Sequence, residues 1–154
     1  LARPRLQIAP SVEEFNPILK EHIVHHLELF KNFIRPLMMD CLVFHHTPWL
    51  PLKKPMPWCV LEYDSPDKSR AVVGIFRLLQ TGGDTYHLFP RGLGRGRMYR
   101  VTFDNTGETI EVSGTDLVNQ GLTISLRNNL TSELLLFQET EHKQVFRTST
   151  SSNH

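Results

Sequence analysis

The chain has 154 residues, of which 40% are apolar and 21% charged, a composition typical of one globular domain that can bury a core. Its formal net charge of +1 gives no electrostatic argument for nucleic-acid binding, so we expect no nucleic-acid partner. No apolar run reaches the roughly 18 residues that a membrane-spanning helix needs, so we expect no membrane partner.

Residues 1–39 are expected to form a lead-in segment and one amphipathic helix. Asn16 can cap a helix with Pro17 in its first turn, and Pro36 is expected to end that helix near Ile34. The apolar residues of the helix recur on one stripe: Leu19, Ile23, Leu27, Phe30 and Ile34. This stripe must be buried, either against a sandwich formed by the rest of the chain or within the preceding domain of a longer parent polypeptide.

Residues 40–146 are predicted to be a β domain, followed by a disordered tail at 147–154. The run of β-branched and aromatic residues at 70–80 predicts the central strand, and 113–121 predicts a single helical turn. Seven shorter strands are predicted at 40–46, 58–64, 85–89, 98–103, 108–112, 122–126 and 132–138. We therefore expect a mainly β fold, an antiparallel sandwich of about eight strands of Greek-key type, preceded by one amphipathic α-helix.

The histidines of the helix are the first candidates for a chemical role. His22 and His26 have the i, i+4 spacing of a zinc-ligand pair, but Ile23 and Val24 occupy the positions where a metalloprotease helix carries its glutamate. A polar helix face explains them better, and we predict no metal site and no cofactor. His45 and His46 would point to opposite faces of a strand, so they could not bind one ion together without a bend.

The segment Arg91–Arg97, RGLGRGR, is similar to a phosphate-binding loop in its glycine content. It lacks the Lys-Ser/Thr ending and the following helix, so we do not predict a nucleotide site. We interpret it as a turn whose glycines adopt positive φ and whose arginines are solvated.

The carboxylates are the candidates for glycoside hydrolysis, which needs two of them held roughly 5–10 Å apart. Almost all of them fall at predicted turns or strand ends, and none has a sequence context that would raise its pKa by burial. The residues considered are Glu62, Asp64, Asp67, Asp84, Asp104, Glu108 and Asp116. We therefore predict no catalytic residue in this chain. Ser113 is not a candidate nucleophile, because the G-x-S-x-G pattern is absent.

Four aromatic residues are candidates for a sugar-stacking platform: Trp49, Trp58, Tyr63 and Tyr86. The two tryptophans flank a proline-rich segment and would be the stacking residues. The favoured alternative places Trp58 in the core and uses Trp49 to pack the proline-rich segment against the domain.

Six segments in this order resemble the C-terminal end of the bacterial α-galactosidases of family 36 of the glycoside hydrolases. The segments are HHLELFKNFIRPLM, FHHTP, WCVLEYDSPDKSRAVVGIFRL, YHLFPRGLGRGRMYRVTF, VSGTDLVNQGLTISL and TSELLLFQ, which together span about residues 15 to 138. The residues that match the family pattern are Phe30-Lys31, Arg35-Pro36-Leu37, Asp67-Lys68, Gly92-Leu93, Tyr99, Ser113-Gly114, Leu117 and Gly121-Leu122. Phe30 departs from the tyrosine that is usual in the family.

The resemblance implies a non-catalytic C-terminal β-sandwich of a retaining α-galactosidase-like hydrolase. Its partner would be a (β/α)8 barrel that carries both catalytic aspartates, and residues 1–39 would end with the last barrel helix. No position here matches those aspartates, so the resemblance implies no catalytic, cofactor-binding or metal-binding residue in this chain. The parent enzyme could act on α-galactosides, on α-N-acetylgalactosaminides, or as a plant-type raffinose enzyme.

Two alternatives remain: a carbohydrate-binding module that uses Trp49 and Trp58, and a homo-oligomerisation domain that pairs the helix stripe. A free-standing enzyme is the least favoured reading. Cys41 and Cys59 form no CxxC motif and are expected to be reduced and buried, a disulfide bridge being the alternative. Together with the absence of a signal-peptide pattern, these cysteines favour a cytoplasmic parent. The start at Leu1 suggests a piece of a longer polypeptide, or removal of an initial Met or a tag.

Overall fold

The computed structural model describes residues 16–48 and 56–140, which begin with a helix. Helix α1 (Pro17–Leu29) starts as expected, because Oδ1 of Asn16 accepts a hydrogen bond of 2.8 Å from the main-chain N–H of Leu19. The helix does not end near Ile34. It continues through a π-helical turn, η2 (Phe30–Ile34), into α2 (Arg35–Leu37). Pro36 follows the π-helical turn directly, where the main-chain N–H of Arg35 bonds to the carbonyl of Phe30, five residues earlier.

Eight strands follow, all paired antiparallel, which confirms the predicted fold class. They are β1 (Leu42–His45), β2 (Trp58–Asp64), β3 (Arg70–Arg77), β4 (Thr85–Leu88), β5 (Met98–Phe103), β6 (Thr109–Ser113), β7 (Leu122–Ser125) and β8 (Thr131–Thr140). Six form one sheet in the order β1-β2-β3-β8-β5-β6, and β4 pairs with β7 in a second sheet. The predicted central strand, β3, lies inside the large sheet between β2 and β8.

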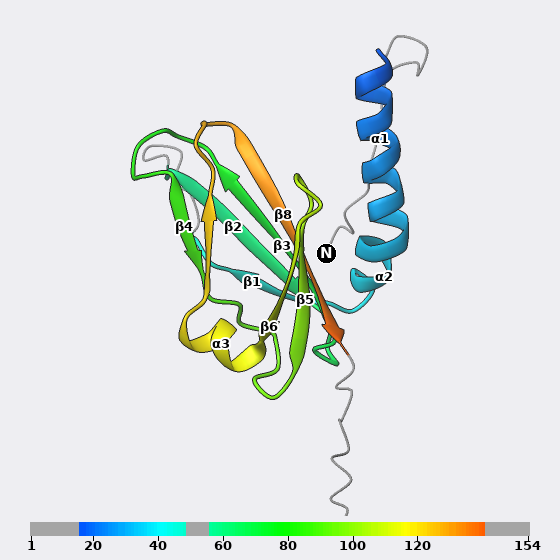
Figure 1. The fold of residues 1–154 in the computed structure, drawn as a ribbon, viewed down its shortest axis with the longest axis vertical. Coiled ribbons are helices and arrows are strands. Elements are labelled where there is room, and N and C mark those ends of the chain that lie inside the picture. The colour runs from blue at the N-terminus through cyan, green and yellow to red at the C-terminus, as the bar shows by residue number, and fades with distance from the viewer. Residues whose placement is uncertain (1–15, 49–55, 141–154) are drawn as a thin grey trace, which may run out of the picture.

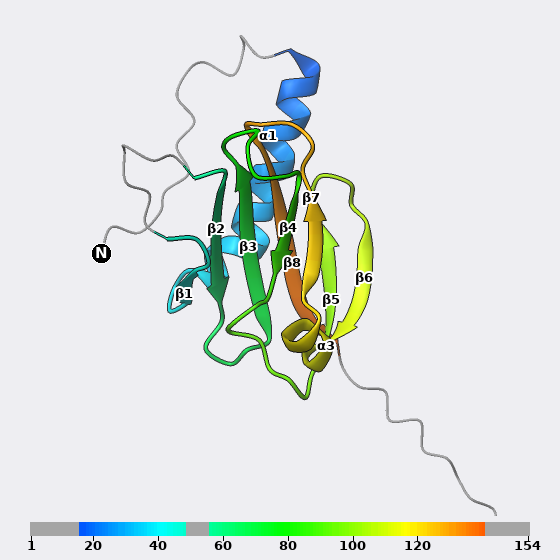
Figure 2. The same ribbon diagram turned by 90° about the vertical axis from the view of Figure 1, so that its left-hand side faces the viewer.

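The large sheet separates two layers (Figure 1). The β4–β7 sheet and the short helix α3 (Gly114–Asn119) cover one face, which we call the sandwich face, and α1 lies against the opposite, helix face. Figure 2, a quarter turn away, shows β4 and β7 in front of the sheet and α1 behind it. Among the described residues, none of the helices combines the length and the hydropathy that crossing a membrane requires.

The core lies on the sandwich face. Alternate residues of the large sheet pack there against Leu88, Leu117 and Ile124 of the covering layer. The sheet residues of this cluster are Trp58, Val60, Ala71, Val73, Ile75, Tyr99, Val101, Leu135 and Phe137, and all are at most 6% exposed. Strand β2 shows the alternation most clearly, because its residues are by turns fully and half buried.

The connection between the sheets contains the predicted single helical turn. Oγ of Ser113 accepts a hydrogen bond of 3.0 Å from the N–H of Asp116 and so caps α3. Gly121 follows with φ +68°, a left-handed conformation that ends the helix and that side-chain-bearing residues rarely adopt.

Candidate functional site

The helix face of the sheet is much less completely buried than the sandwich face. No residue of α1 is buried, and Val24 of this helix is 47% exposed. The predicted stripe does face the molecule, since Ile23, Leu27, Phe30 and Ile34 are half buried, whereas Leu19 is 42% exposed. Further apolar side chains in or beside the helix layer and on β1 and β3 remain open to solvent: Ile18, Met39, Val43 and Phe76. The first turns of α1 project past the end of the sheet in both views (Figures 1 and 2).

A polar contact fixes the helix to the sheet. Nε2 of His25 lies 2.7 Å from Oδ1 of Asp104, which follows β5, and Nε2 of His26 lies 3.9 Å from the other carboxylate oxygen. Nδ1 of His26 also donates a hydrogen bond of 2.7 Å to the main-chain oxygen of His22. The helix histidines therefore attach α1 to the sheet, and among the described residues no group of three potential ligands is arranged to bind a metal ion.

A buried carboxyl pair lies at the end of β2, under the segment that follows β4. Glu62 is 0% exposed and accepts main-chain hydrogen bonds of 2.8 and 3.0 Å from Arg91 and 2.9 Å from Gly92. The ring of His46 also bonds to it through Nε2. Burial alone would raise the pKa of Glu62, but these hydrogen bonds hold the pKa below its ordinary value, so Glu62 is ionised.

The pKa of Asp64, two residues further along β2, is shifted in the opposite direction. Asp64 is 0% exposed, and no donor among the described residues reaches either carboxyl oxygen. Burial, followed by the negative charge of Glu62 and by a hydrogen bond that the protonated acid can donate to Glu62, raises the pKa of Asp64 to about 9. The expectation that no carboxylate has its pKa raised by burial is therefore wrong for Asp64. The alternation of WCVLEYD contained the signal, because it places both acids on the same face of β2 as Trp58 and Val60.

The glycines of the RGLGRGR segment do not adopt positive φ, contrary to expectation, and one of them, Gly92, is required by close packing. The positive-φ glycines of the described residues lie elsewhere, at Gly82, Gly83, Gly107 and Gly121. A Cβ at Gly92 would lie 2.2 Å from Cγ of Asp64, so only glycine lets this segment approach the acid pair. The hydroxyl of Tyr99 fixes the same segment, because it accepts a 2.8 Å hydrogen bond from the N–H of Gly94 and donates one of 2.8 Å to the carbonyl of Lys68.

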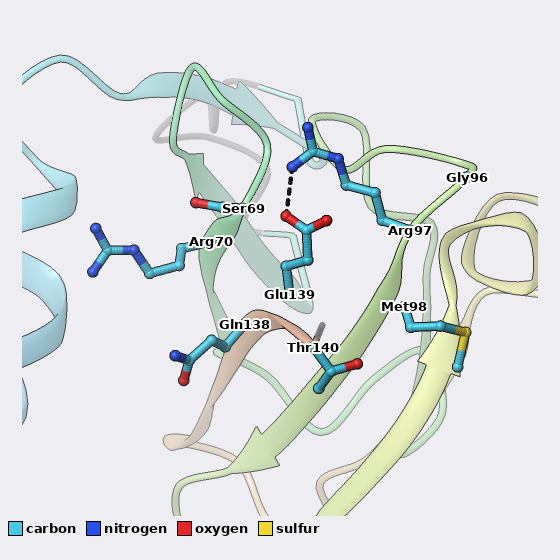
Figure 3. Close-up of a pocket in the computed structure, with 8 residues that line it drawn as sticks. All are labelled: Ser69, Arg70, Gly96, Arg97, Met98, Gln138, Glu139 and Thr140. Atoms are coloured by element: carbon cyan, nitrogen blue, oxygen red, sulfur yellow. Dashed lines mark hydrogen bonds and ion pairs between the residues drawn. The ribbon is translucent and has the colours of Figure 1, made fainter. Parts of the chain in front are cut away.

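Two of the three arginines of this segment have partners in the chain and are not simply solvated. Arg91 donates to the carbonyl of His45 at 3.3 Å, and its guanidinium lies 6.0 Å from the centre of the Phe44 ring. Arg97 and Glu139 point toward one another in a surface hollow between β5 and the start of β3, where they form an ion pair of 2.7 Å (Figure 3). Arg70 and Gln138 of this hollow point away from the pair (Figure 3).

A second hollow is lined by three histidines, together with Tyr86 and Arg91. Two of the histidines have partners within the chain: His46 bonds to Glu62, and Nδ1 of His87 lies 3.0 Å from the hydroxyl of Thr123. These contacts leave fewer polar groups of the hollow available to a ligand.

The proposed sugar-stacking residues do not meet on the described surface. Trp58 is 6% exposed, its ring packs 5.6 Å from that of Tyr86, and the guanidinium of Arg77 lies 5.7 Å from its centre. Trp58 is thus a core residue, as the favoured alternative stated, and Trp49 lies outside the described residues. The expectation that the cysteines are reduced agrees with Cys41 and Cys59, which are free, although both are only partly buried.

Three comparisons relate the chain to known proteins. A profile of the "Glycosyl hydrolase family 36 C-terminal domain" matches residues 58–137. No curated protein sequence matches the chain. Similar solved structures include α-galactosidase AgaA of Geobacillus stearothermophilus in complex with raffinose, with 18% identity and a TM-score of 0.67 over 84% of this chain and 17% of that chain.

The galactosidase domain of the α-galactosidase–sucrose kinase AgaSK is also similar, with 17% identity and a TM-score of 0.64 over 83% of this chain and 17% of that chain. The same AgaA enzyme in complex with 1-deoxygalactonojirimycin gives 18% identity and a TM-score of 0.66 over 84% of this chain and 17% of that chain. At this identity the structural likeness shows the fold, and the chain spans about 17% of the length of these relatives.

Proposed function

Because the chain belongs to the glycosyl hydrolase family 36 C-terminal domain family, we propose that it is the non-catalytic sandwich domain of a larger α-galactosidase-like glycosidase. Its role in that enzyme is to pack against the catalytic barrel and stabilise it. The catalytic carboxylates belong to the barrel, and α1 through α2 is the last barrel helix, held in place by the sandwich.

The observation that carries this proposal is the unequal burial of the two faces of the large sheet. The core of the sandwich face is covered by β4, β7 and α3, whereas α1 and the segment after α2 leave large apolar side chains open, including Ile18 at 68% and Met39 at 64%. The exposed large apolar side chains elsewhere are separate from one another in the sequence: Leu42, Phe89 and Leu130. Exposed apolar surface of this kind is typical of an interface that another structural unit covers. Since the similar solved chains are about five times as long, the remainder of such a chain is the occupant we assign to this surface.

The carboxylates of the described residues support assignment of the chemistry to another domain. The one close pair, Glu62 and Asp64, lies adjacent on a single strand, fully buried beneath main chain, with no opening in which a sugar could lie between them. Asp67 and Asp104 are engaged in a turn and in the helix contact, respectively.

Two measurements test the proposal. The purified chain is expected to give no turnover of an aryl α-galactoside or of raffinose, and measurable turnover by a clean preparation would contradict its non-catalytic role. In the parent enzyme, V24E on the helix face is expected to lower the thermal midpoint by several degrees, whereas the matched charge change N129E, on the exposed connection after β7, leaves it within about a degree. Equal effects of the two substitutions would count against a barrel contact at α1.

A homodimer through α1 would cover the same apolar residues. Light scattering of the isolated chain separates the two occupants, because a barrel interface leaves this chain monomeric or weakly self-associating at micromolar concentration. A stable dimer that V24E dissociates would replace the barrel by a second copy of the chain as the occupant.

A further inference from the structure

Glu62 and Asp64 of β2 both contact the segment 90–93, and the pKa of Glu62 is lowered whereas that of Asp64 is raised. We propose that Glu62 and Asp64 form a pH-sensitive latch, closed when Asp64 is protonated and opened when it ionises, which holds residues 90–93 against β2. The latch concerns the stability of the sandwich itself and is independent of the proposed barrel contact.

The hydrogen-bond donors around the closed latch stabilise only one of the two carboxylates in its charged form. Glu62 uses that charge to accept three main-chain hydrogen bonds from Arg91 and Gly92, in addition to the contact with His46. Asp64 lies on the same face of β2 with both oxygens shielded from solvent and without a hydrogen-bond donor among the described residues. The main chain at Gly92 packs directly on its carboxyl group, so water can reach an ionised Asp64 only if this segment moves away.

Among the described residues, the charged groups around the pair do not neutralise a second carboxylate. His46 is bonded to Glu62, the guanidinium of Arg91 lies over Phe44, and Arg97 pairs with Glu139. Cys41 and Tyr99 face Asp64 from the start of β1 and from β5, and the negative charge of Asp64 acts to raise the pKa of both. Neither is a cation, so the described surroundings favour the neutral acid.

The direction of the pH effect follows from proton linkage. Asp64 changes from an ordinary pKa of 3.8 in the unfolded chain to about 9 in the folded chain, so unfolding releases a proton between these values. The unfolding equilibrium constant should therefore rise up to about tenfold per pH unit from roughly pH 5 to pH 8. Glu62 acts in the opposite direction, because its pKa is lowered on folding, so its contribution is present above its ordinary pKa of 4.5 and lost in acid.

The direct test is to follow the carboxyl carbon of Asp64 by NMR in the 154-residue chain, with D64N used to assign its resonance. We expect a titration midpoint above pH 7, and a midpoint below pH 5 would overturn the latch. If D64N does not fold, E62Q provides the second variant, because removal of the neighbouring negative charge should lower the Asp64 midpoint by at least one pH unit. An unchanged midpoint in E62Q would contradict the coupling.

Opening of the latch is measured separately by amide hydrogen exchange at Gly92. After correction for intrinsic base catalysis, protection at this amide should fall at least tenfold between pH 7 and pH 10 in the wild-type chain and stay constant in D64N. The control is D67N, which makes the same substitution in the exposed turn after β2 and should preserve the wild-type pH dependence. Loss of protection that is equal in wild type and D64N would overturn the assignment of the switch to Asp64.

Discussion

The two faces of the six-stranded sheet differ in how they are completed. On the sandwich face, residues from six of the eight strands and from α3 form one cluster in which most side chains are fully buried. On the helix face, α1 runs behind the strands (Figure 2) and contacts them through a histidine–aspartate pair, and its own apolar residues are at best half buried. The difference indicates that the sandwich face buries its apolar side chains within the chain, whereas the helix face leaves apolar surface that another structural unit could cover.

Removing a large ring from each face gives the largest expected contrast. Phe137 is 0% exposed on the sandwich face and Phe76 is 37% exposed on the helix face. We expect F137A to lower the free energy of unfolding by about 3–5 kcal/mol, because it leaves a cavity, and F76A to lower it by about 1 kcal/mol or less. Urea denaturation of both variants measures the difference, and if F137A does not fold, the pair F137L and F76L should keep the same order. Equal losses of unfolding free energy in the two variants would contradict the difference in burial between the two faces.

A buried arginine at the end of β3 provides the second test. Arg77 is 4% exposed and donates hydrogen bonds to the carbonyls of Leu79, Leu126 and Gln80. R77M keeps the apolar stem but leaves these carbonyls without a donor, so we expect a loss of about 2 kcal/mol in urea denaturation. The control R100M removes an exposed arginine whose ion pair with Glu111 spans 3.6 Å, and it should change stability by less than about 0.5 kcal/mol. A loss in R77M no larger than in R100M would contradict the anchoring role.

The Tyr99 hydroxyl connects the turn before β3 to the segment before β5. In Y99F the N–H of Gly94 and the carbonyl of Lys68 lose their partner inside the domain, with an expected loss of about 1–2 kcal/mol. Y63F removes a hydroxyl from a half-buried tyrosine on the helix face and should change stability by less than about 0.5 kcal/mol, because water can solvate that group. Thermal unfolding of the two variants compares them, and a larger effect in Y63F would reverse the roles of the faces.

The smallest effect is expected at the helix contact itself. H25A removes the side chain 2.7 Å from Asp104, at a site where the histidine is 53% exposed. The histidine is largely exposed although the Asp104 side chain is only 7% exposed, so we expect a loss of about 1 kcal/mol or less in urea denaturation of the isolated chain. A loss above 2 kcal/mol would mean that the helix is an integral part of the folded core.

The sequence was sufficient for the fold because its local signals agree. Segments of alternating apolar and polar residues, bounded by turns rich in Gly, Pro and Asp, predicted both ends of β2 and β5 to the residue. Asn16 with Pro17 predicted the start of α1. The resemblance to family 36 rests partly on WCVLEYD and on Tyr99, which lie inside the span matched by the family profile.

The burial of Glu62 and Asp64 could not be predicted from such local signals. The residues of β2 identified the face on which Glu62 and Asp64 lie, but the cover over that face comes from Arg91 and Gly92, about thirty positions away. Burial by a distant segment is set by tertiary packing, and this is why the carboxylates were expected to be solvated. The same reason explains Gly92 of the RGLGRGR segment, because its need for glycine comes from contact with Asp64 and not from local φ.

Hydrogen exchange of the isolated 154-residue chain tests the central difference between the faces most directly. If the sandwich face is fully packed within the chain and the helix face is covered only by another structural unit, the amides of β3, β5 and β8 should exchange only through global unfolding. Those of α1 should then exchange at least a hundredfold faster. Protection of α1 equal to that of β3 in the chain alone would show that the helix belongs to a self-sufficient core and would contradict the account.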